Sequence, residues 1–313
     1  YSKSLGEQLT LQEAQRAGVQ LSIVRPAIVE SAHTFPFPGW NEGINTCAPI
    51  VYLYWKGQRF SPSHPNNILD VIPVDWVCQG TLLAAAQQLE GTQAKLIYQL
   101  STGGENPLRM RRAIELTNLA WRAQYDKDFK PLKRHIMRNL DTITVTADQY
   151  QRYGAPAIEK TTTQLRGLFK ALPKSARRLI KPIEQGVNAL NKSAKVTDAI
   201  FTLFAPFILE NNPQFESKHA LQAAARLSTE EADILGYPVH TLDWRHYWID
   251  VHMAGLQKWA FGQLDDRLSR PKVINAEQDL VALLRRVCRD YQHKPALQYF
   301  TPEGIAYTYT YGD

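Results

Sequence analysis

The sequence is poor in cysteine. Its three cysteines, Cys47, Cys78 and Cys288, are scattered through 313 residues and show no spacing typical of a metal site. This usage fits a reducing cytoplasm and argues against a disulfide framework, so we expect a cytoplasmic location. No run of about eighteen uncharged apolar residues is present, and no basic segment followed by an apolar one opens the chain. We therefore expect neither a membrane-spanning helix nor a signal peptide.

The sequence also lacks the glycine-rich turn that binds dinucleotide phosphates. No Gly-x-x-Gly-x-x-Gly motif opens a helix, where it would bring a pyrophosphate onto the helix N-terminus. Gly103 and Gly104 follow a predicted strand but do not form this motif. We therefore expect this chain by itself to hold a dinucleotide poorly.

What the sequence does contain is a mildly basic chain with enough apolar residues for packed cores. The net charge is +6 and 44% of the residues are hydrophobic. At roughly 150 residues per domain, the length leaves room for about two domains. The positive charge favours anionic partners such as nucleic acid, a phosphorylated cofactor or acidic lipids, and it equally suits an ordinary basic enzyme. No motif for nucleic-acid recognition accompanies it, so we expect no nucleic-acid partner.

Local patterns predict alternating helices and strands in the first part of the chain. The predicted elements are a helix over 3–17 ended by Gly18, a buried strand over 21–24 closed by Arg25 and Pro26, a strand and turn over 70–75, a helix from Trp76 capped by Asp75, and a strand over 95–100. A helix, a short turn and a buried strand form half of a parallel α/β unit.

The rest of the chain is predicted to be mainly helical. The expected elements are a helix over 108–124, an amphipathic helix over 179–190 interrupted near Pro182, an apolar stretch over 200–209 broken by Pro206, a helix over 243–261, and a β-hairpin formed by 296–300 and 307–311. We divide the chain into domains at 1–125, 126–266 and 267–313.

Four motifs follow one another along the chain. They are Lys3-Ser4-Leu5-Gly6-Glu7, then Val24-Arg25-Pro26-Ala27-Ile28-Val29-Glu30-Ser31, then Pro38-Gly39-Trp40 with Leu69-Asp70-Val71-Ile72-Pro73-Val74-Asp75-Trp76-Val77, and finally the stretch from Asp243 to Leu256. The residues of these motifs and their order along the chain resemble those of the fatty acyl-CoA reductases, which belong to the extended short-chain dehydrogenase/reductase superfamily. The resemblance implies the C-terminal half of a Rossmann-type α/β parallel-sheet domain, followed by a mainly α-helical domain.

The resemblance assigns Lys3 to the lysine of the family's catalytic Tyr-x-x-x-Lys motif. It implies that Lys3 tunes the tyrosine phenol, binds the nicotinamide ribose and serves an NADPH-dependent reduction. The tyrosine would stand two positions before Tyr1, so we expect the chain to be a fragment that lacks its N-terminal half and is inactive alone. A solvated lysine at a helix start is the alternative from the residues themselves.

The other motifs are assigned in the same way. The backbone of Pro26, Ala27, Ile28 and Val29 is implied to lie near the nicotinamide carboxamide, while Glu30, Ser31 and Trp40 are implied to face the acyl substrate. The alternative from the residues themselves is structural: Pro26 would simply end a buried strand, and the Trp40 indole would simply pack in a rigid loop. His246 and Asp250 share one helix face, but no third ligand is spaced to join them, so we expect a local ion pair and no metal site.

A basic segment lies between residues 159 and 198, with nine Lys or Arg and three acidic residues. It is predicted to make peripheral membrane contact, to bind the phosphates of coenzyme A or an acyl-carrier protein, or to form a solvated helix face. The membrane contact would make the protein membrane-associated within the cytoplasm.

The functional prediction is an NADPH-dependent reductase that converts long-chain acyl-CoA or an acyl-carrier thioester to a fatty aldehyde or primary alcohol. Residues 281–313 resemble the opening hairpin of AMP-binding, adenylate-forming enzymes, so part of an acyl-activating ligase is one alternative. Another extended reductase and a noncatalytic module that binds acyl chains or membranes are the others.

Overall fold

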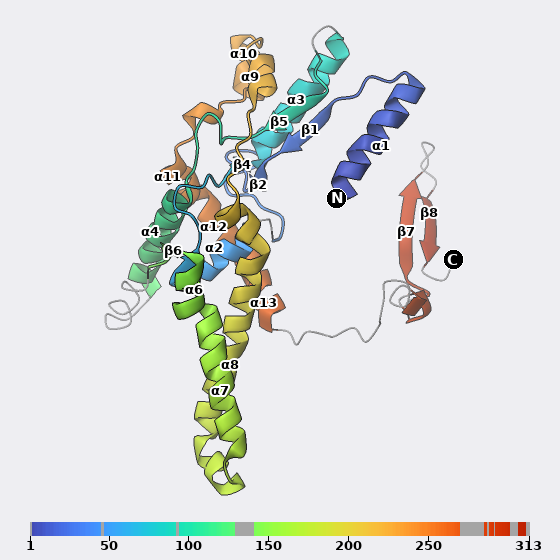
Figure 1. Cartoon of the computed structure of the whole chain (residues 1–313). Coiled ribbons are helices and arrows are strands. Elements are labelled where there is room, and N and C mark those ends of the chain that lie inside the picture. Colours follow the sequence, from blue (N-terminus) through green and yellow to red (C-terminus); the bar gives the residue numbers. More distant parts are fainter. Residues whose placement is uncertain are drawn as a thin grey trace. The chain divides into compact units, whose positions relative to one another are not determined.

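The computed structural model describes residues 2–44, 47–91, 94–128, 141–269, 285–286, 288–290, 292–300 and 306–310. The chain divides into two compact units, Tyr1–Asp266 and Arg267–Asp313 (Figure 1). The predicted division of the first unit at about residue 125 stays a prediction.

Short parallel strand pairs form the sheet part of the first unit. The pairs are β1 (Ile23–Pro26) with β5 (Ile97–Leu100), β2 (Ile28–Glu30) with β4 (Val71–Pro73), and β3 (Phe60–Pro62) with β6 (Ile143–Val145). Between β1 and β2 the chain changes its partner, because the Ala27 N–H donates to Leu100 and the Ile28 N–H donates to Asp70. Parallel strands need crossover connections, which here contain helices, so the predicted α/β class with Rossmann-like pairing is confirmed.

The helices of this part are α1 (Ser2–Ala17), α2 (Ala48–Trp55), α3 (Val74–Glu90) and α4 (Met110–Asp128). Helix α1 confirms the helix predicted over 3–17, and Gly18 ends it in the left-handed conformation with φ of +65°. Helix α1 buries none of its residues, and Leu5 and Leu9 are about half exposed. The strand predicted to be buried, β1, is half-buried at Ile23 and Val24 and exposed at Arg25 and Pro26. Among the described residues, β5 is the strand that pairs with it.

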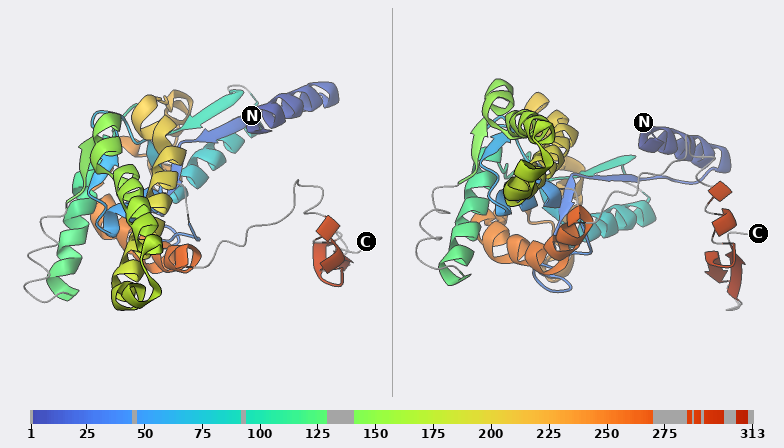
Figure 2. Two further views of the ribbon diagram at one scale, coloured as in Figure 1. Left: turned by 60° about the horizontal axis from the view of Figure 1, so that its bottom comes forward. Right: turned by 90° about the horizontal axis from the view of Figure 1, so that it is seen from below.

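A helical part follows the sheet. Its elements are α6 (Ala147–Tyr153), α7 (Ala155–Ala171), α8 (Lys174–Ala205), η1 (Pro206–Glu210), α9 (Lys218–Ala224), α10 (Thr229–Leu235) and η2 (Val239–Thr241). Helices α7 and α8 pack against each other as an antiparallel pair that projects from the first unit (Figures 1 and 2); we call it the arm. The interruption predicted near Pro182 is wrong, because α8 continues through this residue. An interior proline costs about 3 kcal/mol, and the packing of α8 along α7 offsets this cost.

The last helical stretch of the first unit is continuous and contains π-helical segments. It consists of α11 (Trp244–His246), η3 (Tyr247–His252), α12 (Met253–Leu256), η4 (Gln257–Phe261) and α13 (Gly262–Ser269). Asp243 caps its start by accepting from the Arg245 and His246 N–H groups. The helix predicted over 243–261 is confirmed, and we call Trp244–Phe261 the closing helix.

Among the residues that the structure describes, two apolar clusters join the elements of the first unit. One joins α2, α4, α6 and α8 through residues such as Tyr54, Met110 and Phe201. The other joins β4, α3 and β5 to α9 and the closing helix through Ile72, Leu100 and other residues. The second cluster therefore fixes the closing helix against the carboxyl ends of the strands.

The second unit contains a β-hairpin. Strands β7 (Pro295–Phe300) and β8 (Ala306–Thr310) pair antiparallel, with Tyr299 opposite Tyr307, which confirms the predicted hairpin. The Pro-Glu-Gly turn predicted between them and the helix positions 280, 283, 284 and 287 lie outside the described residues.

Candidate functional site

Buried polar side chains lie at the carboxyl end of β2. Ligands of α/β proteins bind outside the carboxyl ends of parallel strands. Glu30 and Ser31 lie at this end and are both buried. The Ser31 hydroxyl is 3.1 Å from Nδ1 of His252, and the Ser31 carbonyl accepts a hydrogen bond of 2.7 Å from the Tyr247 hydroxyl. The closing helix thus holds Ser31 from two sides.

A second set of contacts surrounds the Glu30 carboxyl group. Oε1 accepts a hydrogen bond of 3.2 Å from the Cys47 N–H, whereas Oε2 is buried without a hydrogen-bond partner. Nε2 of His252 lies 3.9 Å from Oε2. Burial raises the pKa of Glu30 to about 8 and lowers the pKa of His252 to about 3. At neutral pH both side chains are therefore uncharged.

The Pro38-Gly39-Trp40 turn packs backbone to backbone on the closing helix. Gly39 has φ of +77°, and a Cβ built on it would lie 2.8 Å from the Val251 carbonyl oxygen. A Cβ on Gly255 would lie 2.2 Å from the Gly39 carbonyl oxygen. Because real Cβ atoms do not approach oxygen so closely, both positions require glycine. The third and fourth motifs of the sequence are thus in direct contact.

Asp75 holds the loop that precedes this turn. Its two carboxylate oxygens accept hydrogen bonds from the backbone N–H groups of His33, Thr34 and Phe35, at 2.8–3.1 Å. The predicted helix cap is therefore wrong: α3 begins at Val74, after Pro73, and Asp75 lies inside its first turn. A carboxylate that accepts several N–H groups fixes a loop firmly, because hydrogen bonds to a charged acceptor are the stronger kind.

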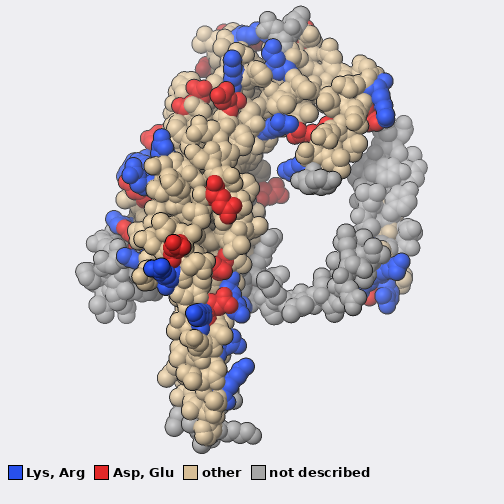
Figure 3. All heavy atoms as spheres, viewed as in Figure 1, with Lys and Arg blue, Asp and Glu red and all other residues tan. Residues whose placement is uncertain are grey.

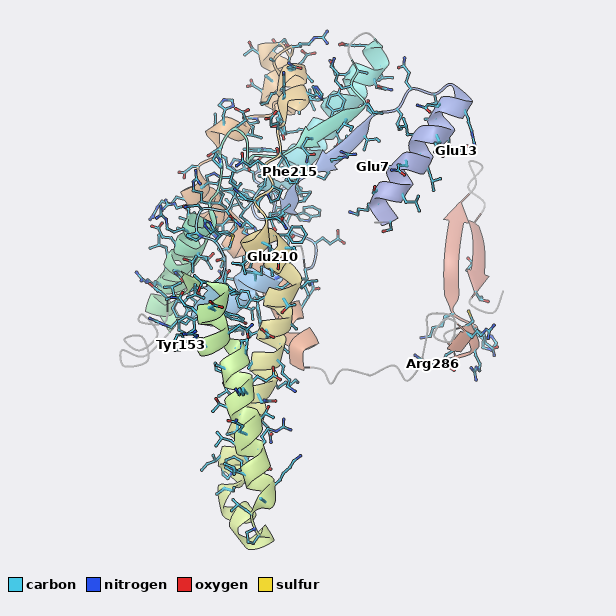
Figure 4. All side chains as sticks on the ribbon, viewed as in Figure 1. Glu7, Glu13, Tyr153, Glu210, Phe215 and Arg286 are labelled. Carbon is cyan, nitrogen blue, oxygen red and sulfur yellow. The ribbon has the colours of Figure 1, made fainter. Side chains whose placement is uncertain are left out.

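Lys3 lies in the first turn of α1 and is exposed. The described contact of α1 with the sheet is the ion pair of Glu7 with Arg25, in which Arg25 Nε donates to Glu7 at 3.1 Å. Figure 4 labels Glu7 on α1. The structure does not bring Lys3 together with Glu30 and Ser31 in any described contact. Its catalytic role stays a prediction.

The residues predicted to face the cofactor lie at the turn between β1 and β2. Pro26 is exposed, and Ala27, Ile28 and Val29 are half-buried. The N–H groups of Ala27 and Ile28 are already bonded within the sheet. Trp40, predicted to face the substrate, is half-buried, and its backbone closes the loop by accepting from the Ala32 N–H.

A pocket of about 680 Å³ adjoins this loop. His33, Thr34, Trp76 and Gln79 line one side, and residues between Leu221 and Leu242 line the other. The rings of His33 and Trp76 lie 5.3 Å apart, and burial lowers the pKa of His33. The pocket wall next to the loop is therefore uncharged at neutral pH.

Several residues of the site were missed by the sequence analysis. Cys47 and His252 were not connected to Glu30, and Tyr247 was not connected to Ser31. Gly255 carried a usable signal, because an isolated glycine inside a helical pattern indicates close packing. The predicted local pair of His246 and Asp250 is confirmed at 3.1 Å, and both side chains are exposed.

Comparison with known proteins defines the class first. Residues 1–81 match the NAD-binding family described as Male sterility protein. Together with the parallel strand pairs, this match indicates that the beginning of the chain is similar to part of an NAD-binding α/β domain. A nicotinamide dinucleotide is the cofactor class that this family implies.

Individual relatives define the family further. The chain is 25% identical to "Fatty acyl-CoA reductase 2, chloroplastic" of Arabidopsis thaliana over 265 residues, which are 82% of this chain and 41% of the relative. It is 22% identical to "Alcohol-forming fatty acyl-CoA reductase" of Simmondsia chinensis, over 82% of this chain and 50% of the relative. It is 24% identical to human "Fatty acyl-CoA reductase 2", over 83% of this chain and 46% of the relative.

These matches confirm the predicted resemblance: over most of its length the chain is similar to fatty acyl-CoA reductases. The chain spans about half the length of the curated relatives it matches.

Proposed function

We propose that the protein containing this chain reduces long-chain fatty acyl thioesters with NADPH. The observation that carries the proposal is the convergence of motifs on the closing helix. Ser31, the Pro38-Gly39-Trp40 turn and the closing helix are three separate parts of the family pattern, and direct contacts join them. The names of the relatives supply the substrate class, a fatty acyl-CoA.

The cofactor would be held at its nicotinamide end by Lys3 and by the turn from Pro26 to Val29. The exposed amine of Lys3 is free to reach a ribose hydroxyl, whereas the bonded N–H groups of Ala27 and Ile28 keep the turn rigid. When bound, NADPH would supply a hydride to the thioester carbonyl carbon and be oxidised to NADP⁺; the carbon–sulfur bond would break, the leaving thiolate would take up a proton, and an aldehyde would remain. A second reduction would give the primary alcohol.

The chain's own residues shape the acyl side of the reaction. Glu30, Ser31 and Trp40 would form the wall nearest the reacting carbon, and the pocket beside His33 and Trp76 would take part of the acyl chain. A pocket of several hundred cubic ångströms is the size that commonly holds a ligand. Burial lowers the pKa of His33, which keeps this side of the pocket compatible with an apolar substrate.

Replacement of Lys3 tests the proposal. In the full-length protein, we expect Lys3→Ala to lower kcat/KM for long-chain acyl-CoA by about 100-fold or more, because it removes a group of the proton-transfer system. Arg16→Ala is the matched control, since it removes an exposed cation from the other end of α1. A Lys3→Ala enzyme as active as the control would refute the role of Lys3.

Two substrate details can be measured in the same assay. Acyl-CoA and acyl-carrier thioesters are compared at equal concentration, with NADPH and with NADH. One NADPH consumed per thiol released indicates an aldehyde product, and two indicate an alcohol. We expect NADPH and acyl-CoA to be the preferred pair.

We further propose that the arm contacts an anionic membrane surface. The arm, Ala155–Ala205, carries nine Lys or Arg and three acidic residues of the 36 and 30 in the chain, so the rest of the chain has 27 of each sign. The whole net charge of the protein is thus equal to that of the arm. Figure 3 shows Lys and Arg side chains on the part of the arm that is not drawn in grey. Leu168, Ile183 and Leu190 of the arm are exposed as well.

The internal construction of the arm supports this role. Asn191 is buried between the two helices, and its Nδ2 lies 2.8 Å from the Thr162 hydroxyl and 3.2 Å from the Glu159 carbonyl oxygen. This polar contact fixes the register of α7 and α8, so the exposed cations keep fixed positions. Among the residues that the structure describes, no helix has both the length and the apolar composition to cross a membrane.

Binding to lipid vesicles tests the arm. Each lysine near an anionic surface contributes about 1 kcal/mol, so Lys170→Gln with Lys181→Gln should weaken binding to anionic vesicles about 30-fold. Lys95→Gln with Lys218→Gln is the charge-matched control outside the arm. Equal binding to neutral and anionic vesicles, or an equal loss in the control, would contradict the proposal. Competition by an acyl-carrier protein without any vesicle binding would assign the arm to that partner instead.

We keep the resemblance of residues 281–313 to adenylate-forming enzymes as a separate proposal. The hairpin of β7 and β8 is compatible with it. ATP-dependent release of pyrophosphate in the presence of a fatty acid would support an acyl-activating activity in the same protein.

The cytoplasmic location expected from the cysteines also stays a prediction.

A further inference from the structure

Three side chains of the kinds that bind transition metals meet behind the carboxyl end of β2. Glu30, Cys47 and His252 come from three separate segments, and one ligand atom from each lies within 4.8 Å of the other two. All three residues are buried, with exposed fractions of 2%, 4% and 0%. Nε2 of His252 is 3.9 Å from Cys47 Sγ and 3.9 Å from Glu30 Oε2.

Two hydrogen bonds leave Nε2 of His252 and Oε2 of Glu30 as the available ligand atoms of these side chains. Nδ1 of His252 is 3.1 Å from the Ser31 hydroxyl, so Nε2 is the ring nitrogen left facing Glu30 and Cys47. Metal-binding histidines typically use their second nitrogen in this way. Oε1 of Glu30 is bonded to the Cys47 N–H, which leaves Oε2 as the free donor atom.

Oε2 of Glu30 is the observation that calls for a ligand. It is a buried carboxyl oxygen without a hydrogen-bond partner. A buried polar atom left in this state costs about 1–3 kcal/mol, and buried polar atoms of this kind are few in native proteins. A cation between Oε2, Cys47 and His252 would satisfy it.

The geometry and the charges fit zinc. Zinc binds sulfur at about 2.3 Å and nitrogen or oxygen at about 2.0–2.2 Å in tetrahedral sites, so its ligand atoms lie about 3.3–3.6 Å apart. The two separations of 3.9 Å would have to shorten by less than about 0.6 Å. A thiolate and a carboxylate neutralise a divalent ion, which makes the complete site electrically neutral in a buried position. A set of sulfur, nitrogen and oxygen donors favours zinc over magnesium or calcium.

We propose that Glu30, Cys47 and His252 bind one zinc-type divalent ion that ties the closing helix to the end of β2 and the start of α2. The fourth position of the tetrahedron falls to water or another small ligand. The site also fixes His252 against Ser31, so it positions the residue that the proposed reductase would use beside its substrate. Uptake of the ion releases the protons that burial holds on Glu30 and Cys47.

Metal content tests this site independently of any reductase activity. The full chain is stripped with a chelator, incubated with Zn²⁺, desalted and measured by elemental analysis. We expect one zinc ion per chain. We expect no bound zinc in Cys47→Ser or His252→Gln, and one per chain in Cys78→Ser and His246→Gln, which change an exposed cysteine and an exposed histidine instead. Ser31→Ala removes only the partner of Nδ1 and should weaken zinc binding about 10–100-fold.

Cobalt gives a second readout on the unaltered protein. Bound Co²⁺ should show a near-ultraviolet absorption from the Cys47 thiolate, and Zn²⁺ should abolish it. Absence of both zinc and this absorption in the folded wild-type protein would overturn the proposal and leave a closed hydrogen-bonded network in which Glu30 keeps its proton. Unchanged zinc binding in a folded Cys47→Ser, His252→Gln double variant would overturn it as well.

Discussion

Helix α1 and the closing helix both carry motifs of the reductase family, yet they are opposite in burial. Helix α1 buries none of its residues, and an ion pair between exposed side chains is its described contact with the sheet. The closing helix buries Tyr247, Trp248, Met253 and Leu256 almost completely. Packing therefore sets the position of the closing helix. For α1, buried side chains do not set its position, and its helical conformation depends on local sequence.

This difference separates two kinds of site residue. Lys3 lies on a helix whose position relative to the strand rests on few contacts, and its role follows from resemblance. Ser31 is held by His252 and Tyr247, so its position follows from packing. Substitutions in the closing helix should therefore have large effects on stability, and substitutions at the contact of α1 should have small ones.

Gly255→Ala should have the largest effect. Its Cβ would lie 2.2 Å from the Gly39 carbonyl oxygen, so the Pro-Gly-Trp turn or the helix has to move. We expect the free energy of unfolding to fall by about 2–4 kcal/mol, measured by urea denaturation. Gly262→Ala is the control in the same helical stretch, where the new Cβ meets no atom within 4 Å. It should be neutral or stabilise by up to about 1 kcal/mol, and equal losses in the two variants would contradict the close packing.

Tyr247→Phe should have an intermediate effect. It removes the hydroxyl that donates to the buried Ser31 carbonyl and leaves that oxygen without this partner. The expected loss is about 1–3 kcal/mol in the same denaturation experiment. Tyr153→Phe removes a hydroxyl from an exposed ring and should change stability by less than about 0.5 kcal/mol. A Tyr247→Phe protein as stable as this control would show that the Tyr247 hydroxyl does not hold the Ser31 carbonyl.

Arg25→Gln should have the smallest effect. Pairs of exposed charges contribute little to stability, so the unfolding transition should stay within error of the wild type. The hydrogen bond from Arg25 lowers the pKa of Glu7, so this pKa should rise toward its ordinary value in the variant. An NMR titration of the Glu7 carboxyl measures the change, with Arg16→Gln as the control that leaves it alone. An unchanged pKa would mean that α1 does not keep its contact with β1 in solution.

The elements that could be predicted are those set by local sequence. The helix over 3–17 and its end at Gly18 depend on apolar spacing and on one glycine in the left-handed conformation. The hairpin of β7 and β8 depends on alternating tyrosines. Glu30 and Ser31 were assigned to the site by the family resemblance, and the structure places them at the carboxyl end of β2.

The elements that could not be predicted depend on contacts between distant residues. Asp75 has the sequence pattern of a helix cap, but its carboxylate meets the backbone of residues about 40 positions earlier. His252 meets Ser31 across 221 residues, and no local pattern encodes that contact. Pro182 indicates a break, but the packing of α8 on α7 outweighs this local preference.

We propose that the protein containing this chain transfers a hydride to an acyl carbonyl. The most direct measurement incubates the full-length protein with NADPH deuterated at the nicotinamide C4 and a long-chain acyl-CoA, followed by mass spectrometry of the products. We predict one deuterium at C1 of a fatty aldehyde, or two at C1 of a primary alcohol, together with free coenzyme A. Release of coenzyme A with an unlabelled fatty acid as the only product would contradict the claim.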